Sequence, residues 1–260
     1  EGALTSAFLP IYSKFIELMG KLFADKFLIK FILRVATFLF LLMIILQIIM
    51  PFCIYFLAPG FLDDDLVLEQ ITILTRITIV FMPLISIVAL LGVATNVSGK
   101  FWVLSFSPII LNVCLIISCL FISDNMSIKS LPLALATVLG GMLQLIFTLI
   151  MIKKFDVLQY KKINIKSETI KESGEIQLYF KKTWEKFIPA AFGGGILQIN
   201  LLVDTILASL LGFGSVSYLY YADRIAQLPL GIIGIALSTA LLTSLSKSSA
   251  IKDKKQFSKE

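Results

Sequence analysis

The sequence contains no histidine and few charged residues, and these two scarcities exclude much of enzyme chemistry. Of its 260 residues, 15% are charged and 58% are hydrophobic, and the mean hydropathy is +0.93. A typical soluble domain has about 25% charged and about 45–50% apolar residues, so the composition argues against a water-soluble globule and against disorder. Without histidine, no imidazole is present for a catalytic triad, a histidine-ligated metal or a switch near neutral pH.

Cysteine is scarce as well. Cys53, Cys114 and Cys119 lie inside apolar stretches, and no pair has the C-x-x-C spacing of a zinc or redox site. We expect packed or lipid-facing thiols, and the sequence predicts neither a metal nor another cofactor.

Four runs of the sequence carry no charge over 23 residues or more. They are residues 35–62, 77–99, 101–123 and 130–152. About 20 helical residues cross a bilayer core of about 30 Å, so each run predicts a membrane span. Residues 187–246 have room for two further helices that turn at 212–215, and residues 1–15 look like the end of a helix. The fold class predicted is all-α, a polytopic integral membrane helix bundle, in a partial chain.

The basic residues alternate between the loops. Of the 23 Lys and Arg residues, 20 fall in the segments that lie on one side of the predicted membrane, which the positive-inside rule assigns to the cytoplasm. The net charge of +6 is therefore a topology signal, and a nucleic-acid partner is not needed to explain it. The lysine-rich segment 154–186 is predicted as a cytoplasmic linker, which either forms an amphipathic helix on the membrane surface or is a solvated connector.

Charged residues inside predicted spans are candidate functional residues, because they normally face the bundle interior or a water-filled cavity. Arg224 is the most informative, since a guanidinium presents its donors in a fork that suits phosphate. Its neighbour Asp223 points about 100° away on a helix and cannot fully neutralise it. A structural ion pair between Arg224 and Asp204 of the preceding helix is an equally good interpretation. Arg76 lies near the end of its span and could reach the interface.

Uncharged polar residues in the spans are weaker candidates. Gln198 and Asn200 precede Asp204 closely, so this polar stretch could line a cavity, although such side chains often join membrane helices structurally. Asn112 and Gln144 are possible site residues on the same grounds.

Several stretches of the sequence are similar to the MurJ (MviN) family of lipid II flippases. They are Glu1 to Pro10, Ala58 to Phe61, Pro108 to Asn112, Gly140 to Leu145, Pro189-Ala190, Gln198, Ser215 to Arg224, and Leu228 to Gly231. The most specific element is Tyr220-Tyr221-Ala222-Asp223-Arg224. The resemblance spans the whole chain in order.

This resemblance implies a multidrug/oligosaccharidyl-lipid/polysaccharide exporter fold with two lobes and alternating access around a cationic cavity. Residues 1–153 would be part of the N-terminal lobe, from the end of helix two through helix six. Residues 187–247 would begin the C-terminal lobe with helices seven and eight, and 248–260 would be a cytoplasmic tail. In the family, the arginine matched by Arg224 is thought to engage the lipid II pyrophosphate. The sequence departs from the family at Gln227, where an acid is frequent, and at Thr243, where a proline is frequent.

The function predicted is a lipid II flippase in the bacterial inner membrane, with lipid II and membrane lipids as its partners. A first alternative is an exporter of the same fold for another lipid-linked saccharide or a small cation. A second is a polyprenyl-phosphate transferase using the acidic cluster Asp63-Asp64-Asp65, and a third is a purely structural bundle.

Overall fold

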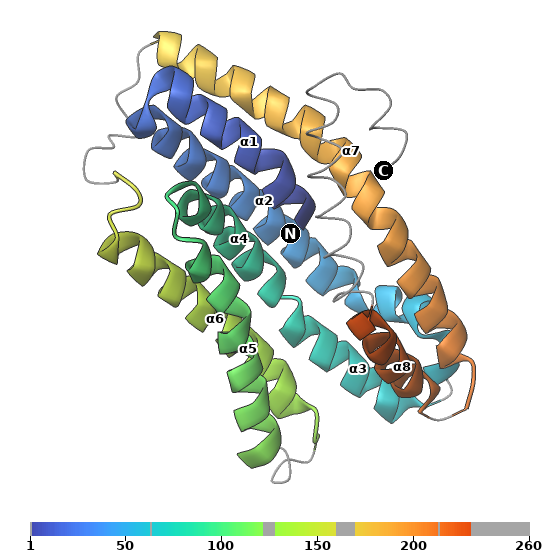
Figure 1. Ribbon diagram of the computed structural model, residues 1–260. Helices are drawn as coiled ribbons and strands as arrows, with labels where there is room; N and C mark the ends of the chain where they lie inside the picture. The colour runs from blue at the N-terminus through green and yellow to red at the C-terminus, as the bar shows by residue number, and fades with distance from the viewer. Residues whose placement is uncertain (1, 63, 122–127, 160–169, 213, 230–260) are drawn as a thin grey trace, which may run out of the picture. The chain divides into compact units, whose positions relative to one another are not determined.

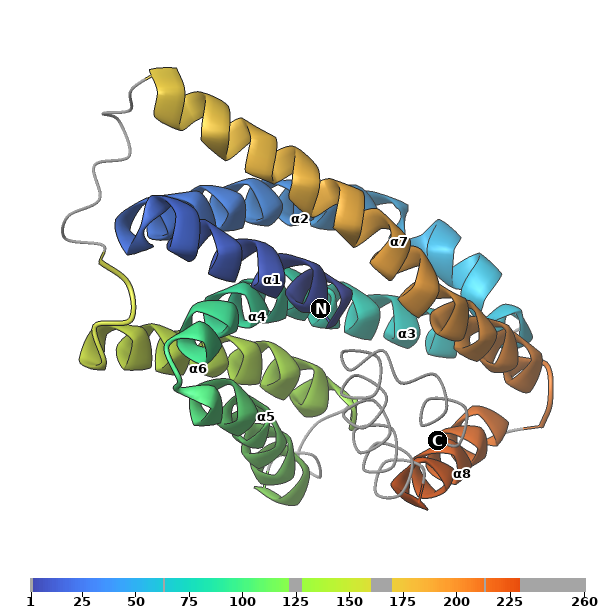
Figure 2. The same cartoon turned by 45° about the horizontal axis from the view of Figure 1, so that its top comes forward.

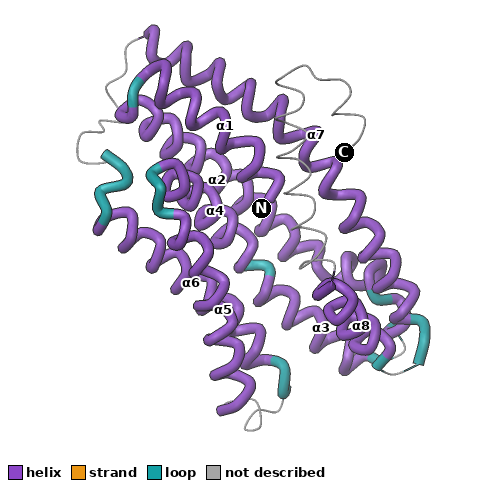
Figure 3. The backbone as a smooth tube through the Cα atoms, viewed as in Figure 1, coloured by secondary structure: helices purple, strands orange, loops and turns teal. Residues whose placement is uncertain are grey.

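The computed structural model describes residues 2–62, 64–121, 128–159, 170–212 and 214–229. Within these ranges the chain forms helices and no strand, as Figure 3 shows. The helices are α1 (Gly2–Met19), α2 (Lys21–Leu57), the short 3-10 helix η1 (Pro59–Phe61), α3 (Asp65–Thr78), α4 (Phe81–Val97), α5 (Phe101–Phe121), α6 (Leu131–Lys154), α7 (Ile170–Ser209) and α8 (Ser215–Pro229). The predicted all-α fold class is confirmed.

Five helical stretches in the described residues are long and apolar enough to cross a membrane. They are Lys21–Leu57, Asp65–Val97, Phe101–Phe121, Leu131–Lys154 and Gln177–Ser209. The four predicted charge-free runs all lie largely within these stretches. The second half of the predicted eighth helix, Thr243 and the tail 248–260 lie outside the described residues.

Helices α3 and α4 together form one of these stretches, with a break at Ile79 and Val80. Pro83 lacks the N–H that would bond to the carbonyl of Ile79, and this missing bond explains why the helix does not run straight through. Upstream, α3 begins with a side-chain cap, because Asp64 Oδ1 accepts from the backbone N–H groups of Leu66 and Val67 at 3.1 Å each. This aspartate of the acidic cluster therefore has a structural role.

The chain divides into two compact units, residues 1–203 and 204–260. In the first unit, α6 packs closely on both α5 and α4 (Figure 1). The approach is close because α6 carries glycine there: a Cβ on Gly140 would lie 3.2 Å from the Cα of Leu111, and one on Gly141 would lie 2.7 Å from the Phe81 ring. Small residues at helix interfaces are how membrane helices gain van der Waals contact.

An aromatic cluster forms the centre of the first unit. It consists of Phe8, Tyr12, Phe15, Phe27, Phe31, Tyr179 and Phe180, all buried. Phe8 stacks on Phe31 with ring centroids 4.6 Å apart, and Phe15 stacks on Tyr179 at 4.3 Å. The cluster thus joins α1 and α2 to the first half of α7, which lies beside α1 in both views (Figures 1 and 2).

The segment predicted as a linker is partly helical in the structure. Helix α7 begins at Ile170 and continues without interruption to Ser209, across the predicted boundary between residues 186 and 187. Its Tyr179, Phe180 and Thr183 are buried, while Lys181 and Lys182 are exposed, so this stretch is amphipathic. The bounds of the lobes and of the linker stay predictions.

Candidate functional site

The candidate site is centred on the polar residues of α8 in the second unit. This helix begins after a turn in which Gly214 adopts a φ of +88°, a left-handed conformation that favours glycine. The Ser215 hydroxyl donates to the carbonyl of Gly212 at 2.6 Å, and the Tyr218 N–H donates to the Gly214 carbonyl at 2.9 Å. The turn thereby fixes where the helix starts, and with it the register of the residues that follow.

Arg224 lies one turn beyond Tyr220 on α8. Its guanidinium carbon is 5.0 Å from the centroid of the Tyr220 ring, which is the geometry of a cation–π contact. Arg224 is exposed, as are Tyr220 and Tyr221. Among the described residues, no hydrogen bond or ion pair uses the guanidinium N–H groups. Within the described part of the chain, the side chain therefore contacts an aromatic ring and its donors have no partner.

Asp223 has a different partner from its neighbour. Its Oδ2 accepts a hydrogen bond from Gln227 Nε2 at 2.5 Å, again across one helical turn. The expectation that Asp223 and Arg224 cannot neutralise each other agrees with these separate partners. Gln227 therefore satisfies Asp223 at the position where the family often carries an acid.

The ion pair considered for Arg224 and Asp204 does not form. Both residues belong to the second unit, and within its described part Asp204 is half-buried on α7 and makes no ion pair. This ion pair, one of the two interpretations that the sequence left open, is therefore not seen among the described residues, and the role of Arg224 stays a prediction.

The other predicted residues divide into exposed and buried ones. Gln198 and Asn200 on α7, Asn112 on α5 and Arg76 on α3 are exposed. The backbone carbonyl of Arg76 accepts from Gln47 Nε2 at 2.7 Å, which ties α3 to α2. Gln144 is 1% exposed, and its Nε2 donates to the carbonyl of Ser107 at 2.9 Å, so it joins α6 to α5.

Sequence reasoning missed the role of Tyr220. The residue belongs to the most specific stretch of the resemblance, but the prediction assigned it no contact. The available signal was its spacing of four residues from Arg224, which places the two side chains on one helix face. The described residues contain no group of three His, Cys, Asp or Glu side chains that could hold a metal ion.

Comparison with known proteins identifies a family that the chain matches. A family model described as "Lipid II flippase MurJ" matches residues 1–260. The chain is similar to a "Probable lipid II flippase MurJ" of Haemophilus influenzae, with 39% identity over 69% of this chain and 33% of the relative. It is also similar to one of Rickettsia prowazekii, at 36% identity over 95% of this chain and 46% of the relative. The "Lipid II flippase MurJ" of Burkholderia cenocepacia is 30% identical over 99% of this chain and 49% of the relative. The chain thus spans a third to a half of the length of these relatives.

Proposed function

Because the chain belongs to the lipid II flippase MurJ family, we propose that the protein moves lipid II from the inner to the outer leaflet of the bacterial cytoplasmic membrane. Lipid II is the undecaprenyl-pyrophosphate-linked precursor of peptidoglycan. No bond is made or broken, so the protein is a transporter. The polar headgroup of lipid II must pass through a sheltered path while its polyprenyl tail stays in the membrane lipid.

The observation that carries the proposal is the environment of Arg224. Its exposed guanidinium is positioned by Tyr220 and is not consumed by Asp204 or Asp223. A planar guanidinium binds phosphate oxygens through two parallel hydrogen bonds. Arg224 is therefore assigned to the lipid II pyrophosphate. Asp223, Asp204, Gln198 and Asn200 are assigned to the polar surroundings of the substrate, with Arg76 and Asn112 as further candidates. Gln144 is the weakest candidate, because it is buried and bonded to the Ser107 carbonyl.

Transport would proceed by alternating access between inward-open and outward-open states, with the lobes rocking about the bound headgroup. A cationic site can also respond to the membrane potential, which is worth about 2.3 kcal/mol per charge per 100 mV across the whole field. This coupling is tested by measuring transport in proteoliposomes with and without an imposed membrane potential. Equal transport rates would show that the potential does not drive transport.

The test is rescue of bacteria depleted of their own lipid II flippase by the full-length protein and its variants. We expect Arg224→Ala to abolish rescue at normal membrane abundance. Arg224→Lys keeps the charge but loses the bidentate fork, and we expect transport about tenfold lower. Lys181→Ala is the matched control, because Lys181 is an exposed cation that pairs with the exposed Glu185, 4.0 Å away on the same helix, and it should rescue fully.

A second candidate function is export of another lipid-linked saccharide or of a small cation. An accessible arginine favours an anionic cargo over a cation, so the saccharide is the stronger of the two. Failure of the intact, membrane-inserted protein to rescue would favour this alternative. Full rescue by Arg224→Ala would show instead that the arginine has no part in substrate binding.

A further inference from the structure

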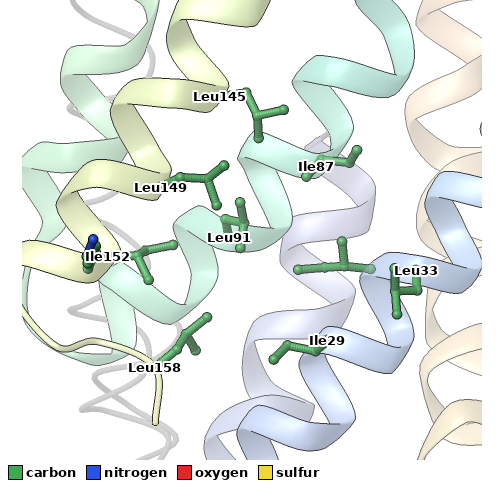
Figure 4. Close-up of a pocket in the computed structure, with 10 residues that line it drawn as sticks. Ile29, Leu33, Ile87, Leu91, Leu145, Leu149, Ile152 and Leu158 are labelled. Carbon is green, nitrogen blue, oxygen red and sulfur yellow. The ribbon is translucent and has the colours of Figure 1, made fainter. Parts of the chain in front are cut away.

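An apolar furrow runs between α2, α4 and α6 in the first unit. It consists of two cavities of about 570 and 440 Å³ that share Ile87. Figure 4 shows the larger one, around which side chains of the three helices gather. On α2 the lining residues recur every three or four positions from Ile29 to Met43, which is one face of a helix. We refer to the two cavities together as the furrow.

The length of the furrow matches one leaflet of a bilayer. Its lining on α6 extends from Met142 to Lys153, which corresponds to about 16 Å at the helical rise, and its lining on α2 corresponds to about 21 Å. Half of a hydrocarbon core about 30 Å thick is about 15 Å. One extended acyl chain of a single leaflet therefore fits along it.

The charge of the furrow is confined to one end. Of all its lining residues, only Lys153 is charged, and Thr37 is the only uncharged polar one. Lys153 lies in the last turn of α6, in a lysine-rich segment that the positive-inside rule assigns to the cytoplasm. A cation at the headgroup level above an otherwise almost entirely apolar channel is complementary to an anionic lipid, because basic sites at this membrane face bind anionic headgroups.

The furrow also has a floor and a mouth. Leu91, Ile152 and Leu158 are buried at its floor, while Leu33 and Leu149 at its edge are 54% and 48% exposed. A chain lying in it would contact protein on several sides and would still be reachable from the lipid. Such a chain gains more apolar contact than one lying on a convex helix surface.

We propose that the furrow binds one acyl chain of an anionic phospholipid of the cytoplasmic leaflet, with the lipid phosphate on Lys153 Nζ. This is a site for a resident membrane lipid, separate from the residues assigned to the transported substrate. It does not depend on the proposed transport function, since binding is measured without transport.

The headgroup half of the proposal is tested by native mass spectrometry of the purified full-length protein in detergent. Phosphatidylglycerol and phosphatidylcholine with identical acyl chains are added separately. We expect one phosphatidylglycerol to bind in preference to phosphatidylcholine, and Lys153→Gln to weaken that binding about fivefold, the effect of one cation near an anionic headgroup. Lys154→Gln is the matched control, because Lys154 lies over the Phe155 ring and does not line the furrow.

Binding of the acyl chain is tested by placing a larger side chain at the exposed edge of the furrow. Leu149→Trp should reduce binding of the retained lipid severalfold, whereas Leu143→Trp, on the same helix at a similar exposure of 46% but outside the lining, should not. Size-exclusion profiles show whether each variant is folded. If Leu149→Trp does not fold, Lys153→Gln still tests the site.

Three results would overturn the proposal. The first is equal binding of the two phospholipids with no effect of Lys153→Gln. The second is displacement of phosphatidylglycerol by an equimolar polyprenyl diphosphate, which would assign the furrow to the substrate tail. The third is absence of any retained lipid in the intact protein, which would show that another segment of the protein fills the furrow.

Discussion

Asp25 and Arg224 are both charged residues on predominantly apolar helices, and their surroundings are opposite. Asp25 is fully buried at the start of α2. Its Oδ1 accepts from the Tyr12 hydroxyl at 2.6 Å, and its Oδ2 accepts from the Gln159 backbone N–H at 2.9 Å. Arg224 is exposed, and an aromatic ring is its partner in the described residues. Asp25 therefore joins three segments of the first unit, whereas the guanidinium of Arg224 has no hydrogen-bond or ion-pair partner among the described residues.

The same contrast holds for the two regions around these residues. Asp25 adjoins the aromatic cluster, where the rings of α1, α2 and α7 pack against one another. Helix α8 instead presents Tyr218, Tyr220 and Tyr221 at exposures above one half. The comparison teaches that the partners of a charged residue, rather than its position within an apolar run of the sequence, indicate whether it serves stability or binding. Variants in the two regions should therefore separate stability from transport.

The largest expected effect is loss of the aromatic cluster through Phe31→Ala. Phe31 is fully buried and contacts Phe8 and Phe180, so its removal leaves a cavity and should cost about 3 to 5 kcal/mol of unfolding free energy. Phe38 lies two turns further along nearly the same face of α2 and is 56% exposed. Phe38→Ala is the matched control and should change stability little. Thermal unfolding of the full-length protein in detergent distinguishes them, and equal losses would contradict the cluster's role.

A smaller loss of stability is expected for Asp25→Ala. This change leaves the buried Tyr12 hydroxyl and the half-buried Gln159 N–H without their acceptor, at a cost of about 1 to 3 kcal/mol. Asp25→Asn keeps one acceptor and should lose less. In the same thermal assay, Arg224→Ala should unfold like the unmodified protein, because Arg224 is exposed on α8. Asp223→Ala removes the hydrogen bond from Gln227 on the same helix and should cost less than Asp25→Ala. If Arg224→Ala were as unstable as Asp25→Ala, the contrast between the two charges would fail.

The sequence predicted the membrane-crossing parts of the fold well, for a physical reason. Hydrocarbon excludes charge over a fixed thickness, so charge-free runs such as 101–123 mark spans directly. Where helices end was less predictable, because charge does not stop a helix. Helix α2 begins at Lys21, well before its charge-free run, and α7 begins at Ile170 inside the lysine-rich segment. There the aromatic cluster stabilises the helix, and its contacts join residues far apart in the chain.

The candidate site was predictable in its residues and less so in its contacts. Arg224 and Asp223 stood out because charge in a span is costly. In the structure Arg224 is exposed on α8 and Asp223 is half-buried. Whether Arg224 would pair with Asp204 depended on side-chain geometry, which spacing cannot supply. Asp25 was not singled out, because its partner Gln159 is 134 residues away. The binding role of Arg224 stays a prediction.

The smallest effect is expected for Gln144→Leu. This change tests whether a buried polar residue in a span joins two helices or lies on the transport path. Gln144 donates to the Ser107 carbonyl on α5, but its buried Oε1 has no hydrogen-bond partner among the residues that the structure describes. Leucine removes one favourable bond and one unpaired acceptor together, and interhelical bonds of this kind average about 0.6 kcal/mol in membranes. We therefore expect a stability change within about 1 kcal/mol and full rescue of flippase-depleted cells. Loss of rescue at unchanged stability would instead place Gln144 with Arg224 among the residues that meet the substrate.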